Sequence, residues 1–257
     1  MPKTDFVPER DGFAFANSFE FTDDERAVLL AKAAPTIDAA LAALGPFGLA
    51  ARIAGLRDSL GRLALGAVPH RYGLCGGMAF AALDYNRAHA PMPPGASSVD
   101  QPAVGSDLRD YLWQRLLDSW RLNGATFLEW KARLHLLPKT WPFDSGRRAL
   151  RDRSRQEWDK LRERLDAGEP TPLGLVGELP NPFLDHQVLA YDYQLADKDT
   201  GTIFVYDSNC PSHPQTIALD FRFEMLVATE SCPRQPENRL RGFFCERYEP
   251  PWRPLPV

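Results

Sequence analysis

Three short segments of this 257-residue chain carry side chains that together could perform nucleophilic chemistry, and the first surrounds Cys75. Cys75 lies in the run Tyr-Gly-Leu-Cys-Gly-Gly-Met, where apolar residues at helical spacing indicate the start of a helix. A thiol reacts as its thiolate, and the free N–H groups and dipole of a helix N-terminus favour that form. Gly73, Gly76 and Gly77 leave room for a substrate, and the Cys75 N–H is a candidate oxyanion donor. The competing interpretation is a small buried cysteine.

The second and third segments offer a base and an acid. His186 begins the apolar run His-Gln-Val-Leu-Ala-Tyr, while Asp207 and Asn209 end the run Ile-Phe-Val-Tyr-Asp-Ser-Asn. A Lys-Asp-Thr-Gly turn at 198–201 predicts a hairpin between these runs. Adjacent antiparallel strands bring the start of one beside the end of the next, so we expect Asp207 to orient His186. Asn209 is the alternative third member, and the competing interpretations are a structural histidine and a simple turn.

The elements that must position these side chains fall into two groups. Up to residue 168, a capping box at Thr22–Glu25 and apolar stripes at helical period predict mainly helices, with stops at Pro35, Gly124 and Gly168. Alternating aromatics at Phe13–Phe21 predict one short half-buried strand. From residue 169, apolar runs separated by turn residues predict antiparallel strands at 173–176, 186–193, 202–207, 216–221 and 242–248.

Helices followed by antiparallel strands predict the α+β class within a single domain, residues 1–257. In this prediction residues 1–168 form a mainly helical lobe carrying Cys75 at a helix start. Residues 169–257 form an antiparallel β lobe carrying His186 and Asp207.

The order of the three segments resembles the papain-like cysteine peptidase superfamily. Within it, the Leu-Cys-Gly-Gly and His-x-Val-x-Ala-Tyr motifs are most similar to bacterial relatives of the peptidases that process double-glycine bacteriocin leaders. The specific motifs cover residues 72–84 and 172–211. The resemblance implies a papain-like fold with the active site between a helical lobe and a β lobe, and a thiol protease using Cys75, His186 and Asp207.

One position departs from that family. Its members place a Gln shortly before the nucleophile as the second oxyanion donor, but the segment Ala-Val-Pro-His-Arg-Tyr at 67–72 has none. His70, Arg71 and Tyr72 are the candidate substitutes, because each side chain can donate a hydrogen bond.

These observations predict a cysteine-dependent hydrolase that cleaves a peptide or another amide through an acyl-enzyme, without a cofactor or a metal. The alternatives are a catalytically inactive papain-like binding or structural protein, a transglutaminase-like acyltransferase and a peptidoglycan amidase. The missing Gln favours the inactive protein.

Composition and charge restrict the classes of binding partner. A net charge of −4 gives no global argument for nucleic acid or an anionic membrane, and no apolar run is long enough to span a bilayer. Arginines between 147 and 155 are expected to form one solvated helix face. The Pro-rich tail at 250–256 suits either a protein partner or the chain's own surface.

Cysteine usage and the N-terminal residues predict the compartment. The four cysteines show no zinc spacing and no disulfide framework, so we expect free thiols, with Cys210, Cys232 and Cys245 as inert packing residues. The first residues lack the order of a secretory signal, which predicts a cytoplasmic protein. Export by a specialised machine without a cleavable signal remains the alternative.

Overall fold

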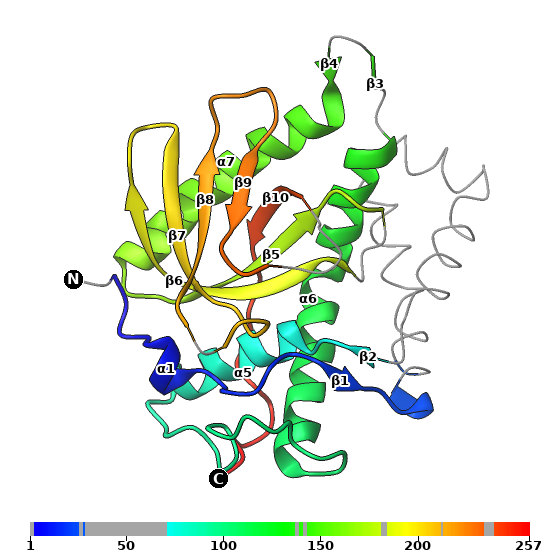
Figure 1. The fold of residues 1–257 in the computed structure, drawn as a ribbon, viewed down its shortest axis with the longest axis vertical. Helices are drawn as coiled ribbons and strands as arrows, with labels where there is room; N and C mark the ends of the chain where they lie inside the picture. The colour runs from blue at the N-terminus through cyan, green and yellow to red at the C-terminus, as the bar shows by residue number, and fades with distance from the viewer. Residues whose placement is uncertain are drawn as a thin grey trace.

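Apolar runs in the C-terminal part of the chain form a closed antiparallel barrel in the computed structural model (Figure 1). The structure describes residues 3–25, 28, 71–136, 139–140, 143–180, 184–211, 213–233 and 239–257. Around the barrel the strand order is β10-β5-β6-β7-β8-β9. These strands are β5 (Thr171–Gly177), β6 (His186–Leu195), β7 (Thr200–Tyr206), β8 (Gln215–Asp220), β9 (Val227–Glu230) and β10 (Leu240–Cys245).

The barrel closes through β9, which the sequence did not reveal. The strand has four residues with alternating exposure and pairs with β8 along its length, and Ala228 also lies opposite Leu240 of β10. A short, half-exposed strand carries little hydrophobic signal, so it was missed. The other five strands of the barrel and the hairpin at 198–201 appear where they were predicted.

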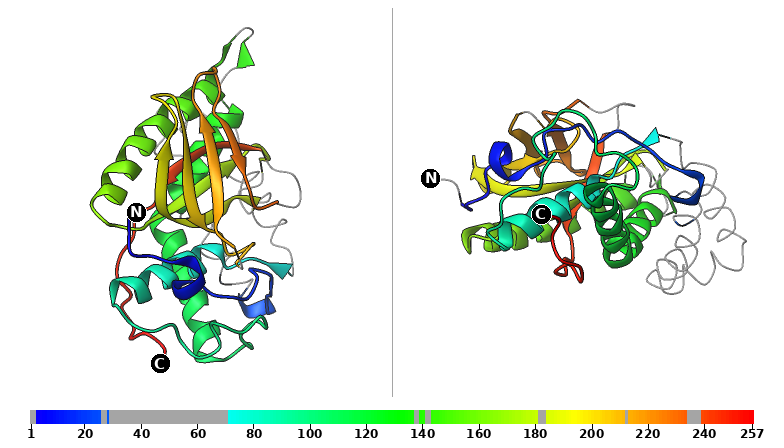
Figure 2. Two further views of the ribbon diagram at one scale, coloured as in Figure 1. Left: turned by 60° about the vertical axis from the view of Figure 1, so that its left-hand side comes forward. Right: turned by 90° about the horizontal axis from the view of Figure 1, so that it is seen from below.

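Two long helices and one shorter helix surround the barrel. These are α5 (Cys75–Arg87), α6 (Asp107–Leu136) and α7 (Ser145–Asp166). Helix α5 packs against α6 and β6, α6 also contacts β5, and α7 lies along β10. Figures 1 and 2 show α7 running diagonally across one side of the strands, while α5 lies at the end of the barrel near both chain termini.

Strand β6 is buried on both faces. Val188 and Ala190 belong to a core shared with Trp158 of α7, whereas Leu189 and Tyr191 belong to a core shared with α5 and α6. Because side chains alternate between faces, one face of β6 packs against the other barrel strands and α7, and the opposite face packs against α5 and α6. Val188 and Ala190 therefore fill a core.

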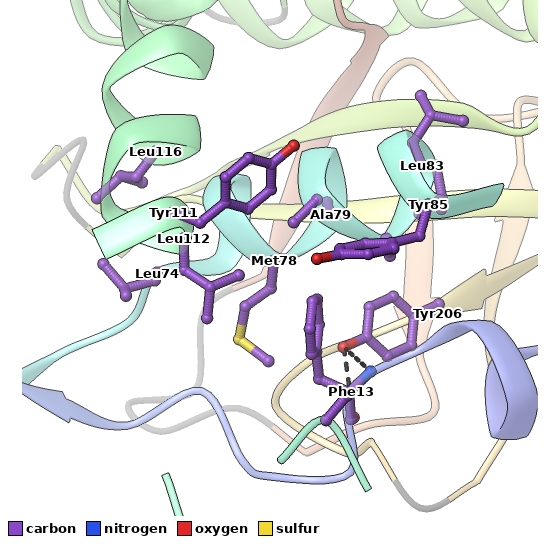
Figure 3. Packing of buried hydrophobic residues seen from close by; sticks show 14 of the residues in the cluster. Phe13, Leu74, Met78, Ala79, Leu83, Tyr85, Tyr111, Leu112, Leu116 and Tyr206 are labelled. Atoms are coloured by element: carbon purple, nitrogen blue, oxygen red, sulfur yellow. Dashed lines mark hydrogen bonds between the residues drawn. The ribbon is translucent and has the colours of Figure 1, made fainter. Parts of the chain in front are cut away.

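The core beside α5 also takes in the N-terminal segment (Figure 3). In it Met78 and Leu112 lie near Phe13, whose backbone N–H donates to the Tyr206 hydroxyl at 3.1 Å. All four aromatics of Phe13–Phe21 are buried, yet only β1 (Phe19–Glu20) is a strand, and it pairs with β2 (Arg71–Tyr72). The remaining described elements are α1 (Pro8–Asp11), β3 (Lys139–Thr140) and β4 (Phe143–Asp144).

Three helix predictions have different outcomes. The capping box forms, since the Glu25 N–H donates to the Thr22 hydroxyl at 3.2 Å and the Thr22 N–H to the Glu25 carboxylate at 2.9 Å. Gly168 ends α7 with φ of +82°, as expected of a C-terminal glycine. Gly124 does not end a helix, because α6 continues through it. The helical material expected after the capping box, including Pro35, lies outside the described residues.

The predicted papain-like fold is wrong. The strands close into a barrel, and the helices do not form a separate lobe that faces them across a cleft. Leu189, Tyr191 and Tyr206 from the strands share one core with α5 and α6, so helices and barrel are packed as a unit. The physical reason is β9, because without it five antiparallel strands would form an open sheet.

Candidate active site

Cys75 is the first residue of α5. The preceding residue, Leu74, provides no side-chain cap for the N–H groups of the first turn. Those groups and the helix dipole therefore favour negative charge at this end of α5. Cys75 is buried, with 6% of its surface exposed. Its expected place at a helix start is found.

The two glycines after Cys75 are required by close packing. A Cβ on Gly76 would lie 1.7 Å from the side-chain oxygen of Gln187, and a Cβ on Gly77 would lie 2.1 Å from the backbone oxygen of Leu112. Both distances are far below van der Waals contact. The glycines thus let α5 approach β6 and α6 closely, which is what holds Cys75 in place.

His186 and Asp207 lie side by side, at the start of β6 and directly after β7. Their Nε2 and Oδ1 atoms are 2.7 Å apart, and both residues are 3% exposed. The backbone N–H of Asn209 donates to the same Oδ1 at 2.8 Å. The structure therefore brings together the two residues that antiparallel pairing predicted.

Cys75 completes the group. Burial lowers the pKa of His186, but the charge and hydrogen bond of Asp207, together with a hydrogen bond to Cys75 and its charge, raise it to about 10. An imidazole held between a thiol and a carboxylate can exchange a proton with the thiol while the carboxylate stabilises its charged form.

The start of β6 is fixed by a buried ion pair. Asp185, the residue before His186, accepts a hydrogen bond from the Gly177 N–H and lies 2.8 Å from the Lys131 ammonium of α6. Lys131 also donates to the backbone oxygens of Gly177 and Leu179. These contacts tie the base to α6 and β5, so the ring of His186 is positioned by three elements.

Asn209 and Asn17 adjoin the imidazole on its Asp207 side. The side-chain amide nitrogen of Asn209 lies 3.2 Å from His186 Nε2, and its oxygen lies 3.0 Å from the amide nitrogen of Asn17. Asn209 was the predicted alternative to Asp207, and the structure places both beside the ring. Asn17 was missed, because a lone Asn 58 positions before Cys75 carries no sequence signal.

A second group of residues that the sequence did not reveal surrounds Gln187, the residue after His186. Gln187 donates to the carboxylate of Glu246, and its oxygen lies 3.3 Å from the Ser119 hydroxyl, which also contacts the backbone of α6. Glu246 is fully buried, and burial raises its pKa to about 8 despite the hydrogen bond of Gln187 and the charge of His186. The only sequence signal was the position of Glu246 directly after an apolar strand.

The predicted oxyanion donors are placed only in part. Arg71 and Tyr72 form β2, four and three residues before Cys75, respectively. His70 lies outside the described residues. The Cys75 N–H at the helix start remains the donor with a defined position.

A disulfide lies next to the site. Cys210 and Cys232 are bonded, with a Cα–Cα distance of 6.0 Å, whereas Cys75 and Cys245 are free thiols. The prediction that Cys210 and Cys232 are free packing thiols is therefore wrong. Spacing alone did not show that β9 brings residue 232 beside the turn at 207–210. Burial and the nearby Glu157 raise the pKa of Cys245 to about 12, which fits an unreactive thiol.

The other surface features have structural explanations. The arginines of α7 pair with acids from several elements, as Arg148 does with Glu224 and Arg153 with Glu129. The C-terminal tail lies on the chain's own surface, where the Tyr85 hydroxyl donates to the Pro256 oxygen at 2.7 Å. Trp252 in this tail is 68% exposed, and a protein partner there stays a prediction.

Among the described residues, no cluster of His, Cys, Asp or Glu could hold a metal ion, and no helix is long and apolar enough to cross a bilayer. No family model, curated protein or solved structure matches the chain.

Proposed function

We propose that this chain is a cysteine-dependent amide hydrolase acting through an acyl-enzyme. The observation that carries the proposal is the position of His186, whose Nε2 lies 2.7 Å from Asp207 Oδ1 and whose pKa is raised by Asp207 and by Cys75. These residues come from three separated segments, so their meeting is not a product of local sequence. Kinship with papain-like peptidases stays a prediction that the proposal does not need.

The geometry supports the following steps. Thiolate Sγ of Cys75 attacks the carbonyl carbon of the amide, forming a C–S bond and an oxyanion near the Cys75 N–H. The His186 imidazolium protonates the leaving nitrogen, and the C–N bond breaks to leave a thioester. His186 then takes a proton from water as it attacks the thioester, which breaks the C–S bond, releases the carboxylic acid and restores the Cys75 thiolate beside the His186 imidazolium. Asp207 stabilises the imidazolium throughout.

Alkylation by iodoacetamide at about pH 6 tests the proposal without knowledge of the substrate. An ordinary thiol is only about 0.3% ionised at that pH. A thiolate paired with His186 should therefore react about a hundredfold faster, and His186→Ala should lose that advantage. Free cysteine in the same buffer is the reference, because the raised pKa of Cys245 makes that thiol slower than an ordinary one.

Two results would contradict the proposal. Labelling of Cys75 no faster than that of free cysteine would favour an inactive binding protein. Transfer of an acyl group to a labelled amine in preference to water would preserve the thiol chemistry and replace hydrolysis with acyl transfer.

The compartment is a separate question. The cytoplasmic location expected from the sequence stays a prediction, and the Cys210–Cys232 disulfide weighs against it. Disulfides persist mainly in oxidising compartments and are rare in the cytosol.

A further inference from the structure

Gln187 connects the two halves of the candidate active site. It follows His186 in β6, and its side chain reaches α5 and α6. There its amide lies against Gly76, the residue after Cys75, because a Cβ at Gly76 would come within 1.7 Å of the Gln187 oxygen. One side chain therefore joins the neighbour of the base to the neighbour of the nucleophile.

The amide of Gln187 is held at both ends. Its NH₂ group donates to the carboxylate of Glu246, and its oxygen lies 3.3 Å from the Ser119 hydroxyl of α6. All three side chains are almost completely buried, so these hydrogen bonds form in a low-dielectric interior where they are strong. The position of the amide is thereby fixed.

Glu246 is itself anchored to the barrel. It follows β10 directly, and its backbone N–H donates to the Pro172 oxygen of β5 at 2.8 Å. Because β5 lies between β10 and β6, the contact between Glu246 and Gln187 spans the strand that separates them. The first turn of α5 therefore rests on a group that two other strands of the barrel hold in place.

We propose that Gln187 is the positioning residue that sets the distance between the Cys75 thiol and the His186 imidazole, with Glu246 as the group that holds its amide. The inference rests on the proposed function. A displacement of about 1 Å between reacting groups can lower a rate about a hundredfold, so a fixed contact one residue away from each partner matters for this pair. Gly76 is then the residue that admits the amide.

The pH dependence of Cys75 alkylation by iodoacetamide tests this role, because it reports the ionisation of the thiol. In Gln187→Ala the rate at about pH 6 should fall by about tenfold to a hundredfold, and the midpoint of the profile should rise toward the ordinary thiol pKa of about 8.5. Near pH 10 the native protein and the variant should react at similar rates, since the thiol is then ionised in both.

Asn123→Ala is the matched control for lost stability. Asn123 is a buried amide of α6 whose hydrogen bonds run to its own helix and to the backbone of Arg247, and they involve neither β6 nor α5. This variant should lower the free energy of unfolding and leave the pH profile of Cys75 unchanged. Urea unfolding shows that each variant is folded under the labelling conditions.

Variants of Glu246 test the same role if Gln187→Ala does not fold. Glu246→Gln should keep the profile, because its amide oxygen can still accept a hydrogen bond from Gln187. Glu246→Leu removes that acceptor and should shift the profile in the same direction as Gln187→Ala.

Gly76→Ala gives a reciprocal test. Alone, its Cβ would collide with the Gln187 amide and with the Ser119 hydroxyl, so the reactivity of Cys75 should fall as it does in Gln187→Ala. Gln187→Ala combined with Ser119→Ala removes the three atoms nearest to that Cβ. Adding Gly76→Ala to this background should therefore change the rate little further.

The outcomes are distinct. The inference would be overturned by an unchanged pH profile in Gln187→Ala, by an equal shift in Asn123→Ala, or by a full further loss from Gly76→Ala in the background without the amide; each leaves the proposed function standing. Alkylation of Cys75 in the unmodified protein no faster than that of free cysteine would instead overturn the proposed function, and the inference with it.

Discussion

At the scale of single residues, His186 lies between two carboxylates in different states. Asp207 contacts its ring directly, whereas Glu246 is hydrogen-bonded to Gln187, the residue after His186. The pKa of His186 is raised to about 10, so it is charged at neutral pH, while the pKa of Glu246 is raised to about 8, so it is mostly neutral there. At neutral pH the His186 imidazolium therefore has one negatively charged partner of the two, Asp207.

Glu246→Gln should raise the stability of the protein at alkaline pH. The pKa of Glu246 is about 8 in the folded chain against an ordinary 4.5, so the folded state loses stability as pH rises from 4.5 to 8. The variant has no such loss. Its free energy of unfolding should exceed that of the native protein by roughly 2 to 4 kcal/mol at about pH 9, and the difference should be small near pH 4.5. Urea unfolding across this range measures it.

Glu249→Gln, at an exposed carboxylate, is the control for Glu246→Gln and should show little change with pH. A Glu246→Gln effect that is independent of pH would contradict the buried, protonated Glu246. The pKa of His186 is raised as well, so its stabilising contribution is lost in both proteins as pH rises from about 6.5 to 10.

The sequence predicted site residues whose chemistry and local context agree. Cys75 precedes two glycines and begins an apolar helix, and His186 and Asp207 lie at adjacent ends of a predicted hairpin. Asn17 and Glu246 could not be found in this way, because each reaches the site through packing between distant segments. Neither carries a motif of its own.

At the scale of elements, α5 is held to α6 by a buried polar network. Arg115 of α6 binds both oxygens of Asp84, which also accept hydrogen bonds from the hydroxyls of Tyr111 and Tyr248. The side chains of Asp84 and Arg115 are almost fully buried. The helix that begins with Cys75 is therefore anchored near its other end by this network, while Gly77 sets its distance from α6.

Arg115→Leu should destabilise the protein by about 3 to 5 kcal/mol, because it leaves the Asp84 carboxylate buried without its cation. Arg121→Ala on the same helix is the matched control. Its ion pair with Glu249 is exposed, so its loss should cost less than about 1 kcal/mol. Chemical denaturation of both variants measures the difference, and equal effects would show that the buried network contributes no more than a surface pair.

Strand and helix predictions failed where tertiary structure overrides local preference. Gly124 is tolerated inside α6, since the packing of a long helix outweighs the cost of one glycine. The residues of β9 do not alternate between apolar and polar types, because pairing with neighbouring strands, and not its own burial, makes it a strand. The error at Gly124 divided one helix into two in the prediction. The missed β9 had the larger effect, because it led to the wrong fold.

At the scale of the whole molecule, the disulfide joins two parts of the barrel. Cys210 follows the turn that carries Asp207 and Asn209, and Cys232 follows β9. The bond therefore links the acid of the site to the strand that closes the barrel.

Replacing both cysteines of this bond by serine should lower the free energy of unfolding by about 3 kcal/mol, given their separation of 22 residues. A reducing agent should bring the native protein to the same stability. Cys245→Ser is the control and should leave the sensitivity to reductant intact. Four free thiols in the purified protein, or no effect of reductant, would contradict the bond and restore the case for a cytoplasmic protein.

The closing contact of β10 has a consequence for synthesis on the ribosome. β10 pairs with β5 and β9 and ends at Cys245, so the barrel cannot close until residue 245 has emerged. Cys75 leaves the exit tunnel long before His186 and Asp207 can take their places in the barrel. A nascent chain that stops before β10 therefore carries the thiol without the assembled group around it, and any activity should begin only after β10 has emerged.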